Sequence, residues 1–153
     1  MLTPDQERFV LAVMAGHNIL TVATIRDDGY PQATTVAYAN DRLSLYFACS
    51  PDSQKLDNIR RCNKVSATID RDEKDWGRIQ AVSLGGIAEV LSDPAEIRRA
   101  TDLLVEKFPA MKAMAEAEGE AAEDMRFVRI SPQVISAIDY TQGFGHTELL
   151  RVG

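Results

Sequence analysis

Three short runs rich in β-branched and aromatic residues follow one another between Ile19 and Cys49. They read ILTVATI, ATTVAYA and LSLYFAC, and turn-forming residues separate them at 27–29 (Asp-Asp-Gly) and 40–41 (Asn-Asp). Short runs of this kind, bounded by such turns, are typical of antiparallel strands. The pattern predicts a three-stranded antiparallel meander, so a large part of the chain has to build a sheet.

Helical signals lie on both sides of this region. Residues 3–16 open with Thr-Pro-Asp-Gln, which supplies an N-cap, a proline at the first helical position and a capping-box Gln, and they end in Gly. Residues 93–108 open with Asp-Pro-Ala-Glu and carry apolar residues at helical spacing, which predicts a second helix. Residues 109–124 are rich in Ala and Glu and predict either a further helical piece or a mobile acidic excursion.

Strand character returns in the second half of the chain, at residues 64–70, 79–91 and 125–140. Gly85-Gly86 predicts a bulge or a sharp bend where a sheet curves, and Pro132 predicts a break or an edge position. Six or so strands with helices at the front, in the middle and near the end predict an α+β, mainly β fold. We expect a six-stranded antiparallel barrel with flanking helices.

Composition limits the class of protein. At 153 residues and 45% apolar content, we expect one closed core and a single domain over residues 1–153. The net charge of −6, without a basic run, disfavours nucleic acid or an anionic membrane as partner.

Cys49 and Cys62 form no disulfide framework, and no signal segment or membrane-length apolar run is present, so the expected location is the cytoplasm. No metal-ligand spacing or catalytic set for hydrolysis is found.

The segment ACSPDSQK joins the third apolar run to a predicted helix. Ser50 is placed as N-cap and Pro51 at the first helical position, so we expect the helix to begin at Asp52. A helix N-terminus offers free backbone N–H groups, and here Ser53 adds a hydroxyl and Lys55 a cation within one turn. This combination suits a terminal phosphate. A capped surface helix with a solvated lysine is the alternative interpretation.

At this point the chain resembles the FMN-binding split-barrel proteins related to pyridoxamine 5′-phosphate oxidase. The resemblance covers most of the chain and rests on the order and spacing of several segments. These are the N-terminal helix, TVATIRDDGYPQATTVAY, YFACSPDSQKLDNI, VSLGGIAEVL and DYTQGFGH. It implies a split β-barrel that binds FMN.

In the resembled family, Ser and basic residues of the loop and helix hold the flavin phosphate, which implies Ser53 and Lys55 here. Where the oxidase has Ser-Arg-Lys this chain has Ser-Gln-Lys, so Arg60 or Arg61 is the available substitute for the missing cation. The flavin ring lies along two strands whose small side chains allow close approach. The implied cofactor contacts are Thr34, Thr35, Val36, Ala48, Cys49, Ser50, Ser53, Lys55, Gln80, Phe144 and His146.

The resemblance also implies an FMN-dependent oxidoreductase that acts on an unidentified small molecule. It implies a homodimer with the flavin site at the subunit interface, in which the partner covers the ring. Phe144 and His146 lie in the best local candidate for that cover. The family's substrate pattern of an Arg and a His close to a Trp is not reproduced in QGFGHTELLR, so vitamin B6 oxidation is not predicted.

Two other functions stay open. One is a reductase of the same fold that uses the deazaflavin F420, whose longer acidic tail needs more basic residues than this loop supplies. The other is a non-enzymatic flavin or haem carrier or sensor. Three residues also have purely structural interpretations: Cys49 as a core thiol, His146 as a solvated side chain and Trp76 as a turn anchor.

Overall fold

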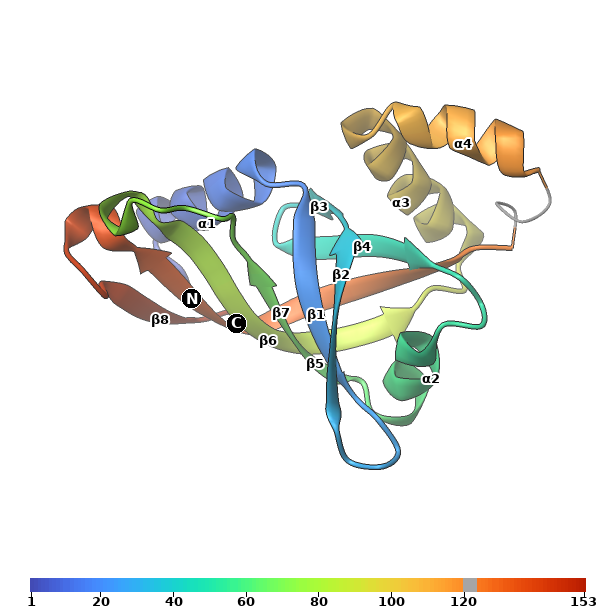
Figure 1. Ribbon diagram of the computed structural model, residues 1–153, viewed down its shortest axis with the longest axis horizontal. Helices are drawn as coiled ribbons and strands as arrows, with labels where there is room; N and C mark the ends of the chain where they lie inside the picture. Colours follow the sequence, from blue (N-terminus) through green and yellow to red (C-terminus); the bar gives the residue numbers. More distant parts are fainter. Residues whose placement is uncertain (120–123) are drawn as a thin grey trace.

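The structure is a computed structural model, and it describes residues 1–119 and 124–153. Within these described ranges, four α-helices and two short 3-10 helices surround one curled sheet (Figure 1). In chain order the elements are α1 (Pro4–Gly16), β1 (Ile19–Ile25), β2 (Pro31–Ala37), β3 (Ala39–Asp41), β4 (Ser44–Cys49), α2 (Gln54–Arg61), β5 (Lys64–Ile69), η1 (Trp76–Arg78), β6 (Gln80–Val90), α3 (Pro94–Lys107), α4 (Ala110–Glu118), β7 (Arg126–Asp139), η2 (Tyr140–Gln142) and β8 (Thr147–Arg151).

The sheet is antiparallel throughout and runs in the order β2-β1-β5-β6-β7-β4-β3, with β8 paired to β7. Its curl brings β2 against β4, although these two strands share no hydrogen-bonded ladder. The predicted α+β split barrel is confirmed as a class. Among the described residues the sheet has eight strands rather than six, because two short segments add to the predicted ones: β3, which pairs with β4, and β8, which pairs with β7 over residues 134–138.

The predicted three-stranded meander is wrong in its third strand. The β1–β2 hairpin is confirmed, but β4 pairs with β7 and with the short β3, and the Asn-Asp pair at 40–41 lies in β3 instead of forming the turn. Burial explains this choice of partner. Leu45 and Phe47 are fully buried and lie opposite Ile130 and Val128, which are fully buried too, whereas β2 offers only half-buried and exposed side chains.

The main core fills the inside of the curled sheet and extends under two helices. Val10, Val13 and Met14 of α1 and Leu56 and Ile59 of α2 join it. The two helices lie toward opposite ends of the sheet in Figure 1. A smaller cluster, around Tyr46, Leu91 and Ala100, lies under α3.

The predictions for α1 and α3 hold at the helix ends. Thr3 caps α1 in a capping box, and Asp93 caps α3 by accepting from Ala95 N, with Phe108 as the C-cap. Of the Ala/Glu-rich segment, residues 110–118 form α4, and residues 120–123 lie outside the described residues. No helix among the described residues is both long and apolar enough to cross a membrane.

The predicted irregularity at Gly85-Gly86 is confirmed as a register shift against β7, opposite Pro132. A Cβ atom on Gly86 would lie 2.6 Å from the backbone oxygen of Ser131, whereas one on Gly85 would meet only a methyl group of Val134 at 3.2 Å. The close approach of two backbones therefore requires glycine at position 86.

We expect Gly86→Ala to lower the free energy of unfolding by about 2 kcal/mol, because the backbone of β7 has to move. Gly85→Ala is the matched control and should lose less, since a valine side chain can adjust. Urea denaturation of the two variants measures the difference. Equal losses would contradict the assignment of the close contact to Gly86.

Candidate functional site

The sheet does not close between β2 and β4, and we call the seam where these two strands meet without a hydrogen-bonded ladder the slot. In the described part of the chain β2 pairs only with β1, and β3 covers β4 only over residues 44–46. One backbone edge of β2 and one edge of residues 47–49 are therefore without a strand partner, and the two strands lie against each other. Unpaired edges present N–H and C=O groups that a ligand can use. Both predicted ring-binding segments, 34–36 and 48–50, border this slot.

The side chains along the slot alternate between the two faces of the sheet. Thr34 and Val36 are half-buried, and Thr35 is exposed. Ala48 is half-buried, so a ring that lies over this part of β4 meets little bulk. The hydroxyl oxygen of Thr34 is buried and has no hydrogen-bond partner among the described residues.

Cys49 directs its thiol into the core, where the side chain is 6% exposed. Burial raises the pKa of this thiol, while Lys55, a hydrogen bond from Ser53, Arg60 and Arg126 act in the opposite direction. The thiol is thus a packed core group. Only the backbone of Cys49 borders the slot.

The helix after the slot begins later than predicted. Ser53, not Ser50, is the N-cap, and α2 starts at Gln54 rather than Asp52. Pro51 and Asp52 lie in a turn instead, which Ser53 N closes by donating to the Ser50 carbonyl at 3.0 Å, while Asp52 N donates to the Ser50 hydroxyl at 3.3 Å. This turn satisfies the backbone before the helix starts.

The later start places both predicted phosphate contacts at the helix end itself. The Ser53 hydroxyl does not cap the helix and instead accepts from Lys55 Nζ at 3.3 Å. The hydroxyl, the ammonium group and the first N–H groups of α2 therefore lie together. This is the donor set that an anion requires at a helix N-terminus.

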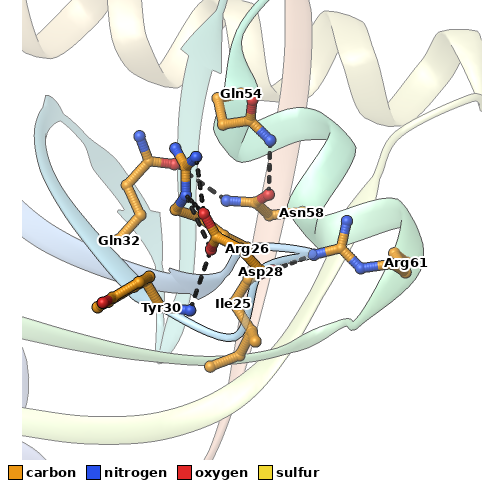
Figure 2. Close-up of polar contacts among 8 residues, drawn as sticks. All are labelled: Ile25, Arg26, Asp28, Tyr30, Gln32, Gln54, Asn58 and Arg61. Atoms are coloured by element: carbon orange, nitrogen blue, oxygen red, sulfur yellow. Dashed lines mark hydrogen bonds and ion pairs between the residues drawn. The ribbon is translucent and has the colours of Figure 1, made fainter.

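Two arginines add positive charge on the same side of the barrel. Arg60 and Arg126 line a pocket of about 460 Å³ that Glu89 also borders, and Arg126 lies directly opposite Cys49 in the β4–β7 ladder. Arg61 is used elsewhere, since its Nη2 donates to the Ile25 carbonyl at 2.5 Å (Figure 2). Of the two candidate substitutes, Arg60 is therefore the one near the Cys49 side, and Arg126 was missed from the sequence because it belongs to a distant strand.

Asn58 connects α2 to the β1–β2 hairpin (Figure 2). It is fully buried, and its amide nitrogen donates to Thr24 Oγ1 and Gln32 Oε1, both at 3.0 Å. Its amide oxygen accepts from Gln54 Nε2 at 2.9 Å. Gln54, which replaces the family's arginine, is thus turned toward the protein. Asn58 fixes the helix that carries Lys55 relative to the strand that borders the slot.

The remaining predicted contacts gather near η1 and η2, far from α2 (Figure 1). Phe144 is 77% exposed, and its ring centroid lies 5.8 Å from that of Trp76 and 5.4 Å from that of Tyr140. Gln80 is exposed at the start of β6. His146 is half-buried, and its buried Nε2 has no hydrogen-bond partner among the described residues, with Glu148 Oε1 at 3.8 Å. One chain thus presents two separate groups of predicted contacts.

Comparison with known proteins identifies the family. The model of the pyridoxamine 5′-phosphate oxidase family matches residues 7–139, so the chain belongs to this family. Members of the family commonly bind flavin. Among the described residues, no group of three or more His, Cys, Asp or Glu side chains is arranged to hold a metal ion.

Solved structures share the fold. A haem-binding protein from Mycobacterium smegmatis superposes with a TM-score of 0.78 at 20% identity, over 99% of this chain and 60% of its own. A conserved hypothetical protein from Mycobacterium tuberculosis gives 0.75 at 25% identity, over 100% and 92%. A haem storage protein from Vibrio cholerae gives 0.68 at 16% identity, over 84% and 92%. This chain therefore spans less than two thirds of the first of these proteins.

The residues at the slot and near η2 suit a flavin. Two buried side-chain polar atoms in the described part of the chain have no hydrogen-bond partner, and they belong to Thr34 and His146. Burial without a partner costs free energy, which a ligand or a neighbouring chain relieves. Both atoms belong to predicted flavin contacts. Together with Ser53 and Lys55, they make the donor set compatible with a ring that forms hydrogen bonds and a side chain that ends in a phosphate.

Proposed function

We propose that the protein is an FMN-binding flavoprotein, a single domain over residues 1–153 that acts in the cytoplasm as a flavin-dependent oxidoreductase on a small molecule. The observation that carries this proposal is the slot of unpaired strand edges that leads to Ser53 and Lys55 at the start of α2. When bound, the flavin would supply the hydride chemistry. The chain supplies the anchor, the hydrogen bonds and the shape of the cleft.

Ser53, Lys55 and the helix N-terminus anchor the phosphate in this proposal. Lys55 is half-buried and already bonded to the Ser53 hydroxyl, so little side-chain freedom is lost when an anion binds. Arg60 and Arg126 add long-range attraction to a chain whose net charge is −6. The backbone edges at 34–36 and 47–49 bond the ring.

Lys55→Ala should weaken FMN binding at least about tenfold, the equivalent of roughly 1.4 kcal/mol, because one charge-assisted bond to the phosphate is lost. The melting temperature of the ligand-free protein should hardly change. Flavin fluorescence quenching measures the affinity, and Lys74→Ala, an exposed lysine on another loop, is the control. Full FMN affinity in Lys55→Ala, or a loss as large in Lys74→Ala, would refute the phosphate assignment.

The flavin site is shared between two copies of the chain in this proposal. One wall comes from the slot, and the other comes from Phe144 and His146 of the second copy, since in their own chain these residues lie by η2, at the other end of the sheet from α2 (Figure 1). The exposed rings of Trp76 and Phe144 provide apolar area for such a contact. A two-fold dimer then carries two equivalent sites.

FMN should therefore shift the chain toward dimer, and dimer formation should raise FMN affinity by linkage. Sedimentation at low micromolar protein, with and without FMN, measures the shift. Phe144→Ala should weaken both association and FMN binding. A monomer that keeps full FMN affinity would rule out the shared site.

Haem binding is the second candidate function. It is favoured by His146, whose Nε2 has no hydrogen-bond partner among the described residues, as a haem ligand would require. The loop that carries His146 also holds the aromatic ring of Phe144. Two solved structures of the same fold belong to proteins named for haem, which supports this possibility. A Soret band on haem addition that is lost in His146→Ala, with no binding of FMN, would favour this function over the flavoprotein.

A further inference from the structure

Asp139 ends β7 and is the acceptor for several side chains of the η1–η2 region. Its side chain is 8% exposed. Oδ1 accepts from Gln80 Nε2 at 3.2 Å and from the backbone N and hydroxyl of Thr141 at 3.2 and 2.6 Å, and Oδ2 accepts from Gln142 Nε2 at 3.0 Å. Burial acts to raise the pKa of Asp139, but these hydrogen bonds outweigh it and hold the pKa below its ordinary value.

An ionised carboxylate only accepts hydrogen bonds, and this fixes the orientation of the Gln80 side chain. Its amide must turn the NH₂ group toward Asp139. The carbonyl oxygen Oε1 is therefore left for an outside partner, and Gln80 is exposed at the edge of a pocket of about 380 Å³. Gln80 Oε1 is thus a hydrogen-bond acceptor that a ligand in this pocket can reach.

Asp139 also holds the loop at 140–146 against the start of β6. Its backbone N donates to the His146 carbonyl at 3.0 Å, and Tyr140 N donates to the Ile79 carbonyl at 2.9 Å. The loop then returns Phe144 to the ring of Trp76. Loss of the carboxylate would leave these backbone bonds in place but would remove those to Thr141 and Gln142, which loosens the start of the loop, and the one that orients the Gln80 amide.

We propose that Asp139 is a positioning residue that orients the Gln80 amide with Oε1 outward and holds the 140–146 loop, so that the site selects a ligand that presents an N–H group to Gln80. The N3–H of an isoalloxazine ring is such a group. The identity of the ligand rests on the proposed function, but the positioning itself does not.

The free protein provides the first test. Trp76 is the only tryptophan of the chain, so its fluorescence reports on the contact with Phe144. In Asp139→Ala the emission should change toward that of Phe144→Ala. The emission of Asp139→Asn should stay near that of the wild type. The amide oxygen of Asn can keep the three bonds that Oδ1 accepts, and its NH₂ group can donate to Gln142 once the Gln142 amide turns over. Gln142→Ala is the control and should leave Gln80 in place.

A second measurement needs no variant of Asp139. In the ¹⁵N spectrum of the wild-type protein, the Gln80 side-chain amide, assigned by its loss in Gln80→Ala, should show one proton shifted and protected from exchange. Two amide protons that both have the shifts of an unstructured glutamine and both exchange rapidly with water would overturn the proposal, and so would a folded Asp139→Ala with unchanged Trp76 emission.

FMN separates this inference from the proposed function. Asp139→Ala should weaken FMN about tenfold, and the loss should be smaller in a Gln80→Ala background by the share that acts through Gln80, while the share that acts through the loop remains. Additive losses would overturn the role through Gln80. If the wild type binds no FMN while the fluorescence and amide signals behave as expected, the flavin proposal fails and the positioning role of Asp139 stands.

Discussion

Asn58→Ala is expected to lower the free energy of unfolding by about 3 kcal/mol. The side chain is fully buried and makes three hydrogen bonds, to Thr24, Gln32 and Gln54. Each such bond contributes about 1 kcal/mol, and the loss is larger where a buried partner is left unsatisfied, as it is for Thr24, which is also fully buried. The missing side-chain volume adds a cavity beside Ile59.

Urea denaturation of Asn58→Ala beside Asn63→Ala measures this effect. Asn63 is exposed in the connection between α2 and β5, so Asn63→Ala should change the free energy of unfolding by no more than about 0.5 kcal/mol. The Asn58 variant should also bind FMN more weakly, because α2 is no longer fixed to the hairpin. A loss below about 1 kcal/mol would mean that the network in Figure 2 does not hold α2 in place.

Signals from residues close in sequence predicted the helix ends and the bulge, because these features depend on neighbouring residues. The N-cap residues Thr3 and Asp93 fixed the starts of α1 and α3, since capping involves residues only two or three positions apart. The bulge at Gly86 was predictable because glycine is the residue that permits a close backbone approach. The order of these segments predicted an α+β barrel, and the resemblance to the split-barrel family implied its split form.

The partner of β4 could not be predicted in the same way. Leu45 and Phe47 pair with residues more than 80 positions later in the chain, and a pattern of turns and apolar runs carries no information on which strand will face them. The hydrophobic match between β4 and β7 exists only once both strands are placed. This is why the adjacent hairpin was extended to a meander that does not form.

In the site, too, the features set by neighbouring residues were predictable, and those set by distant parts of the chain were not. The Ser-Gln-Lys segment is visible in the sequence. The proline after Ser50 favours Ser50 as the cap, but a turn closed by the bond from Ser53 N to the Ser50 carbonyl moves the cap to Ser53. Asn58 and Asp139 were missed. Asn58 stands out only as a polar residue between the apolar Leu56 and Ile59, and that spacing is the one signal that could have marked it.

The phosphate should dominate flavin affinity. Ser53, Lys55 and the helix N-terminus act on it, and charge-assisted bonds contribute about 1.5–3 kcal/mol each. Riboflavin keeps the ring and the ribityl chain but lacks this group. Two such bonds give a difference of about 3 kcal/mol or more, so FMN should bind on the order of 150-fold more tightly than riboflavin. Most of this difference should be lost in a Ser53→Ala, Lys55→Ala double variant.

Calorimetric titration of the protein with FMN and with riboflavin, in the same buffer and at the same salt concentration, tests the central claim most directly. The account predicts an FMN affinity about 150-fold above that of riboflavin, with a preference that shrinks in the double variant and persists in Lys74→Ala. Equal affinities for the two flavins, or no binding of either, would contradict the assignment of a flavin phosphate site to the start of α2.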